Sequence, residues 1–79
     1  MSKYIINPMD ENEFIKQIGL NIKALRVKRE LHQKDLADFA LLNINSIGKI
    51  ERGEQNFTIS SLCAIAKVLK VHPKDLLDV

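Results

Sequence analysis

The segment from Gln33 to Gly53, QKDLADFALLNINSIGKIERG, contains two short helical patterns separated by a break. Apolar residues recur before and after the break at the spacing of one buried helical stripe. These residues are Leu36, Ala37 and Ala40, followed by Ile47 and Ile50. We therefore predict helices over 33–39 and 44–52, with Asn43 as the N-cap of the second helix and Gly53 as its left-handed end.

The second of these helices has two different faces. At about 100° per residue, a set of mostly polar residues lies opposite the stripe of Ile47 and Ile50. The set consists of Asn45, Gly48, Lys49 and Arg52. We expect one face to pack inside the protein and the other to display an amide, two cations and a bare stretch of backbone.

Helical patterns also flank this segment. A stripe before it predicts a helix from Glu11 to about Arg29, and Thr58 is a good N-cap for a further helix. Pro73, preceded by His72, suits the first position of a short final helix, and Phe57 should fill the core from the preceding loop. The apolar positions are Phe14, Ile15, Ile18, Ile22 and Leu25, then Leu62, Ile65, Ala66 and Leu69, then Leu76 and Leu77. The fold class is all-α, with five helices and no strand.

The size and charge of the chain set limits on its class. Its 79 residues form one domain, 1–79, in which 1–9 are expected to be an N-terminal arm. Twelve basic and ten acidic residues leave a formal charge of +2, which does not by itself indicate a nucleic-acid partner. No apolar run approaches the roughly 18 residues that would cross a membrane.

The reactive residue types form no recognisable catalytic set. His32 and His72 have no acid, serine or cysteine at a useful spacing, and there is no glycine-rich phosphate loop or metal-ligand cluster. Cys63 is the single cysteine, fits a reducing cytoplasm, and is expected to be a small apolar filler. We predict neither an enzyme nor a cofactor or metal site.

The predicted first helix has a second apolar stripe, formed by Leu20, Ala24 and Val27. One small core does not obviously require it. The stripe either packs under the Tyr4-Ile5-Ile6 arm or contributes to a contact between subunits.

The pattern from about Ile18 to Leu77 resembles the helix-turn-helix family of lambdoid phage repressors, Cro proteins and restriction-modification controller proteins. The resemblance rests first on the two helical patterns and the break between them in Gln33 to Gly53. The other residues behind it are Ile22, Leu25 and Arg26, then Ile50-Glu51-Arg52-Gly53, then Leu62, Ile65, Ala66, Leu69, Val71 and Leu76. The resemblance implies a compact, lambda-repressor-like domain in which helices 2 and 3 form the motif and helix 3 lies in the major groove.

The resemblance makes Asn45 and Lys49 the main candidates for reading DNA bases. An Asn side chain pairs with adenine and a Lys donates to guanine acceptors. Ile44 stands where similar proteins often place a polar base-contacting residue, so it either meets a thymine methyl group or packs on helix 2. Gly48 either lets helix 3 approach the DNA more closely or reflects drift at a tolerant position.

Other positions match contacts to the DNA backbone in this family. Gln33, at the start of helix 2, is expected to bond a phosphate and orient the reading helix. Further candidates for phosphate contact are Ser46, Arg52, Asn56 and Thr58. Thr58 has a rival role as helix cap.

Two positions bear on the packing of the motif. Arg26 and Glu51 match residues that commonly pair in such domains, and helical phasing puts Glu51 at the edge of the inward stripe, so we predict a partly buried, structural ion pair. The corner residue that is most often glycine in the family is Leu41 here. Either Leu41 is left-handed at a cost of about 1–3 kcal/mol, or the turn differs.

These observations predict a sequence-specific regulator that binds double-stranded DNA as a homodimer on a roughly palindromic operator, and that either blocks or recruits RNA polymerase. The rival hypothesis is a protein-interaction module, for example an antitoxin-like partner binder, that keeps the fold without specific DNA binding. The small net charge, Ile44 and Gly48 favour the rival.

Overall fold

The computed structural model describes residues 10–78, which form five helices. They are α1 (Glu11–Lys28), α2 (Gln33–Ala40), α3 (Ile44–Glu51), α4 (Ile59–Leu69) and α5 (Pro73–Leu76). No strand occurs among residues 10–78, so the all-α class is confirmed. Helix α2 is one residue longer than predicted, and α3 is one residue shorter because Arg52 is its C-cap.

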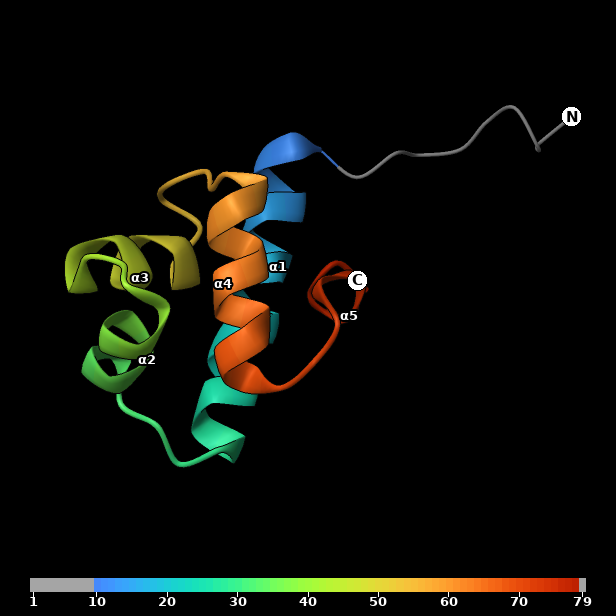
Figure 1. The fold of residues 1–79 in the computed structure, drawn as a ribbon. Helices are drawn as coiled ribbons and strands as arrows, with labels where there is room; N and C mark the ends of the chain where they lie inside the picture. Colours follow the sequence, from blue (N-terminus) through green and yellow to red (C-terminus); the bar gives the residue numbers. More distant parts are fainter. Residues whose placement is uncertain (1–9, 79) are drawn as a thin grey trace, which may run out of the picture.

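The helices surround one shared core. Figure 1 shows α4 running beside α1 through the middle of the molecule, with α2 and α3 on one side and α5 on the other. Helix α3 packs on both α1 and α2, while α4 packs on α2 and α5. This arrangement holds α3 at the edge of the domain, where one of its faces is left toward solvent.

The predicted apolar stripes supply that core, except that Leu77 is the C-cap of α5 and is 38% exposed. The buried members of the core are Ile18, Ile22, Leu36, Ala37, Ile47, Ile50, Leu62, Ile65, Ala66, Leu69 and Leu76. Phe57 packs against them from the α3–α4 loop, as predicted. The expectation for Cys63 is wrong, because its side chain is exposed: Leu62 points inward, and the next residue is rotated by about 100° toward solvent.

The ends of the helices follow the predicted capping chemistry. Asn43 Oδ1 accepts a hydrogen bond from the Asn45 backbone N–H at 2.7 Å, which caps α3. Thr58 Oγ1 accepts from the Ser61 N–H at 3.0 Å, which caps α4. His72 Nδ1 accepts from the Lys74 N–H at 3.1 Å, and Pro73 is the first residue of α5. Each cap satisfies a backbone donor that the helix itself leaves unpaired.

The corner between α2 and α3 contains the left-handed leucine. Leu41 has φ +59°, and the residue is 91% exposed. The Leu42 N–H donates to the Ala37 carbonyl oxygen at 2.8 Å, a pairing typical of a left-handed helix end. The turn therefore keeps its usual geometry without glycine. Gly53, at φ +74°, ends α3 as predicted.

A close approach of α1 to α3 depends on Gly19, which the sequence analysis did not identify. Gly19 is buried, and a Cβ atom there would clash with the Ile50 carbonyl oxygen and lie 2.8 Å from that of Glu51. Because both neighbours are backbone atoms, neither can move away cheaply. Gly19 thus sets how deeply the end of α3 sits against α1.

The second stripe of α1 faces solvent. Leu20, Ala24 and Val27 are all exposed. The Tyr4-Ile5-Ile6 arm that was one expected cover lies outside the described residues. Within 10–78, no helix is both long and apolar enough to cross a lipid bilayer.

Candidate nucleic-acid interface

The outward face of α3 presents the two predicted base readers. Asn45 and Lys49 are both exposed and lie four residues apart, which places them one turn from each other on the same side of the helix. Ile44 precedes them and is 44% exposed, so it is only partly packed. The face surrounds a shallow hollow of about 300 Å³, lined by Gln33, Ile44, Asn45, Gly48, Lys49 and Arg52.

Gly48 does not provide the bare backbone that was expected. It is buried, and the atoms over it belong to two side chains. A Cβ atom at Gly48 would stand 3.1 Å from Arg52 Nη1, 3.8 Å from Arg52 Cζ and 3.7 Å from Gln33 Oε1. The expectation is wrong because Arg52 lies back along the helix axis over the previous turn.

The predicted ion pair between Arg26 and Glu51 is present and connects α1 to α3. Arg26 Nε donates to Glu51 Oε2 at 2.7 Å, and Arg26 Nη2 donates to Glu51 Oε1 at 3.1 Å. The side chains are 11% and 2% exposed. Arg26 Nη1 also donates to the Leu31 carbonyl oxygen at 2.8 Å, so each end of this bidentate pair is well satisfied.

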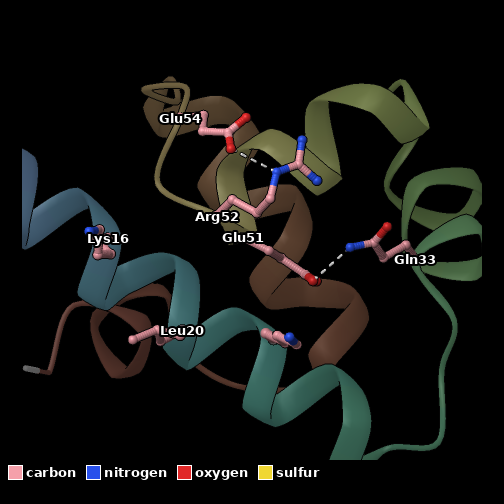
Figure 2. Close-up of a pocket in the computed structure, with 7 residues that line it drawn as sticks. Lys16, Leu20, Gln33, Glu51, Arg52 and Glu54 are labelled. Carbon is pink, nitrogen blue, oxygen red and sulfur yellow. Dashed lines mark hydrogen bonds and ion pairs between the residues drawn. The ribbon is translucent and has the colours of Figure 1, made fainter.

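Gln33 joins the same network from α2. Its Nε2 donates to Glu51 Oε1 at 3.0 Å, as Figure 2 shows. The residues Arg26, Gln33 and Glu51 thereby fasten three helices at one point. No periodicity in the sequence signals this bond, because it links residues of two helices whose packing is not encoded locally. A primary amide has two N–H groups, so Gln33 retains a second donor beside this bond.

Arg52 forms a second arginine–glutamate pair, on the surface. Its Nε lies 3.0 Å from Glu54 Oε2, and the two side chains are 56% and 55% exposed. The hydrogen bond from Arg52 holds the pKa of the Glu54 carboxyl below its usual value, and the same bond raises the pKa of the guanidinium. Both groups therefore remain charged at neutral pH. This pair was not among the sequence predictions.

Glu51 of the buried pair and both members of the surface pair border one groove. Figure 2 shows this groove between α1 and the end of α3. Its volume is about 550 Å³, and its lining consists of Lys16, Leu20, Lys23, Gln33, Glu51, Arg52 and Glu54. Lys16 and Lys23 add two exposed cations from α1. The groove beside the outward face of α3 is therefore lined by three cations and two carboxylates, and Lys16 and Lys23 are the cations that could meet a phosphate backbone.

The other three predicted backbone contacts lie apart from this groove's lining. Ser46 is half-buried on α3. Asn56 is exposed in the α3–α4 loop, where its Oδ1 accepts from the Phe57 N–H at 2.7 Å. The Thr58 hydroxyl is engaged as the cap of α4, which is the rival role foreseen for it. No group of three His, Cys, Asp or Glu side chains suited to a metal ion occurs in the described chain.

Comparison with known proteins agrees with this geometry. The helix-turn-helix family model matches residues 22–76, so this chain belongs to the helix-turn-helix family. It is a DNA-binding transcriptional regulator and not an enzyme.

Similar proteins include several that are named control or controller proteins. Control protein C.BamHI of Bacillus amyloliquefaciens is 38% identical over 61 residues, covering 76% of this chain and 75% of that protein. Control protein C.SmaI of Serratia marcescens is 35% identical over 69 residues, covering 87% and 79%. The crystal structure of the restriction-modification controller protein C.AhdI from Aeromonas hydrophila superposes with a TM-score of 0.77 at 27% identity, covering 78% of this chain and 94% of that one.

Proposed function

We propose that this chain is a restriction-modification controller that binds a roughly palindromic operator as a homodimer and regulates a few nearby genes. The observation that supports this most directly is the outward face of α3, with Asn45 and Lys49 exposed beside a groove that Lys16 and Lys23 border. The similarity to control proteins favours this role over that of a phage-type repressor. Such a regulator would act in the cytoplasm, by blocking or recruiting RNA polymerase.

In this proposal α3 enters the major groove. The Asn45 amide pairs with an adenine, and the Lys49 ammonium donates to the O6 and N7 atoms of a guanine. Each good pairing contributes about 1–3 kcal/mol of discrimination between bases. Ile44, which is exposed enough to meet a thymine methyl group, adds a preference for an A·T pair.

Phosphate contacts would orient α3 in the groove. Gln33 donates its second amide N–H at the start of α2, while Arg52 supplies a guanidinium at the end of α3. Ser46 and Asn56 contact the flanking strand. Thr58 is the weakest member of this set, since its hydroxyl already caps α4.

Dimerisation follows from the small number of phosphate contacts that one subunit offers. Two linked subunits bind more tightly because the second subunit binds at a high effective concentration. Their reading helices would lie about 34 Å apart, in successive major grooves. An apolar hollow of about 350 Å³ involving α1, α4 and α5, bordered by Phe14, Phe57, Ile59 and Leu77, supports a subunit contact there. The exposed stripe of Leu20, Ala24 and Val27 is the second candidate.

A gel-shift titration against the DNA upstream of the chain's own gene, at two salt concentrations, tests this function. We expect a shift at submicromolar protein in low salt and a steep loss of affinity in high salt. Asn45→Ala and Lys49→Ala should weaken specific binding and leave thermal unfolding nearly unchanged. Lys67→Ala is the matched control, because this exposed lysine lies on α4, away from the α3 face.

The same titration contains the outcome that would contradict the proposal. If no shift occurs at micromolar protein in low salt, the chain is a protein-interaction module that keeps the fold. A large loss of stability in either reader variant would remove that residue from the reading set. Analytical ultracentrifugation of the free protein and of the complex tests the homodimer separately.

A further inference from the structure

We infer that Gly48 is a positioning residue, which holds the Arg52 guanidinium in place for a DNA phosphate. The inference rests on the proposed DNA binding and adds a residue to its machinery. Gly48 interrupts a helix that alanine would stabilise, so its presence calls for a reason. The side chains that cover it supply one.

The Arg52 side chain lies over Gly48. Arg52 is four residues further along, so its side chain can reach back over the Gly48 turn. A Cβ at Gly48 would stand only 3.1 Å from Arg52 Nη1, which is tighter than an ordinary van der Waals contact. A side chain at this position therefore requires the guanidinium to shift by a few tenths of an ångström from the place it occupies over Gly48.

Two neighbouring side chains, those of Glu54 and Gln33, orient the Arg52 guanidinium. Glu54 Oε2 holds the Nε atom at 3.0 Å, on one side. On the other side the Gln33 amide, itself fixed by Glu51, faces the same point above Gly48, with its Oε1 3.7 Å from the Cβ position. Figure 2 shows the guanidinium between the Glu54 and Gln33 side chains.

This placement leaves part of the guanidinium available to a DNA phosphate. Because Glu54 takes the Nε atom, the Nη1 and Nη2 groups are the donors left for a phosphate. They lie next to Gln33, the other predicted phosphate donor, so the two residues form one clamp across α2 and α3. Fixing an arginine before the DNA arrives reduces the conformational entropy that binding must otherwise remove.

The test is a double-mutant cycle on DNA affinity with Gly48→Ala, Arg52→Ala and the double variant. One phosphate contact adds about 0.9 to the slope of log K against log salt, so its loss at 0.1 M salt lowers affinity about eightfold. We expect Gly48→Ala to cause a measurable part of this loss when Arg52 is present and none when it is added to Arg52→Ala. Cognate and unrelated DNA should lose affinity alike, because phosphates carry no sequence information.

A second measurement separates positioning from folding. Alanine is the better helix former, so the thermal midpoint of Gly48→Ala should rise or stay unchanged while its affinity falls. A purely structural role would move both in the same direction. Equal effects of Gly48→Ala in the wild-type and Arg52→Ala backgrounds would overturn the inference.

A third measurement needs no DNA, so the inference can fail apart from the proposed function. In ¹⁵N NMR relaxation of the free protein, the Arg52 Nε–H should be ordered in the wild type and mobile in Gly48→Ala. If Arg52 is equally mobile in both, Gly48 does not position it. If Arg52 is ordered as expected but no DNA binds, the positioning stands, the phosphate role is overturned, and the proposed function fails with it.

Discussion

Glu51 and Arg52 are consecutive residues at the end of α3, and each forms one arginine–glutamate pair. The distances are similar, 2.7 Å from Arg26 to Glu51 and 3.0 Å from Arg52 to Glu54. The surroundings are opposite. The Arg26–Glu51 side chains are 11% and 2% exposed, whereas those of Arg52–Glu54 are 56% and 55% exposed.

This contrast shows that burial, more than bond length, determines what an ion pair does. Removing one partner of a buried pair leaves a charge that neither water nor protein compensates. An exposed pair contributes little to stability, and its guanidinium can exchange a carboxylate for a phosphate. A rotation of about 100° between neighbouring residues thus places Glu51 in the interior and Arg52 on the surface, where we propose that it contacts DNA.

The largest effect should come from Glu51→Ala. It leaves the Arg26 guanidinium buried without its carboxylate, and we expect the free energy of unfolding to fall by about 3–5 kcal/mol. Urea denaturation at pH 7 measures this. The matched control is Arg26→Met with Glu51→Leu, which should recover most of the loss because both charges are gone. A loss below about 1 kcal/mol in Glu51→Ala would make the two pairs equivalent and contradict the comparison.

Gln33→Ala should affect both pairs at once. It removes a hydrogen bond to the buried carboxylate, at a cost of about 1.5–3 kcal/mol when the acceptor is charged. It also removes one side of the support around Arg52 and a predicted phosphate donor, so DNA affinity should fall as well. Urea denaturation and gel-shift titration on the same preparation test this. If only the free energy of unfolding or only the DNA affinity changes, Gln33 supports just one of the two arginine–glutamate pairs.

Arg52→Ala should change binding much more than stability. Loss of one phosphate contact lowers the salt slope by about 0.9 and the affinity at 0.1 M salt by about eightfold. The thermal midpoint should fall only slightly, since the pair that is lost is exposed. Arg52→Lys, which keeps the charge, should retain the salt slope. A fall in the thermal midpoint as large as that of Glu51→Ala would place Arg52 in the fold instead.

The smallest effect should come from Glu54→Gln, and it should depend on pH. The folded-state pKa of Glu54 is lowered, so the pair stabilises the fold above the carboxyl's ordinary pKa of 4.5, and this contribution is lost as pH falls through the lowered value. The wild type should therefore melt slightly above Glu54→Gln at pH 7, and the gap should close toward pH 3. Paired thermal melts at the two pH values check this. A difference in melting temperature that grows toward pH 3 would contradict this prediction.

Local patterns in the sequence predicted much of the fold and part of the candidate site. Periodicity identified the helices, the core stripes and the outward position of Asn45 and Lys49, because these depend on residues at most four apart. Capping residues marked the starts of α3 and α4 for the same reason. The Arg26–Glu51 pair came from the family resemblance together with helical phasing.

What the local patterns missed depends on how the helices approach one another. The closeness of α1 and α3 at Gly19, the bond from Gln33 to Glu51 and the position of the Gln33 amide over Gly48 all arise from such contacts. Leu41 was also left undecided by the sequence, which allowed either a left-handed leucine or a different turn between α2 and α3. The structure has the left-handed leucine. Periodicity is a property of each helix alone, so it establishes which faces are apolar. Only the packing of α1, α2 and α3 brings Arg26, Gln33 and Glu51 together, because no single helix contains them.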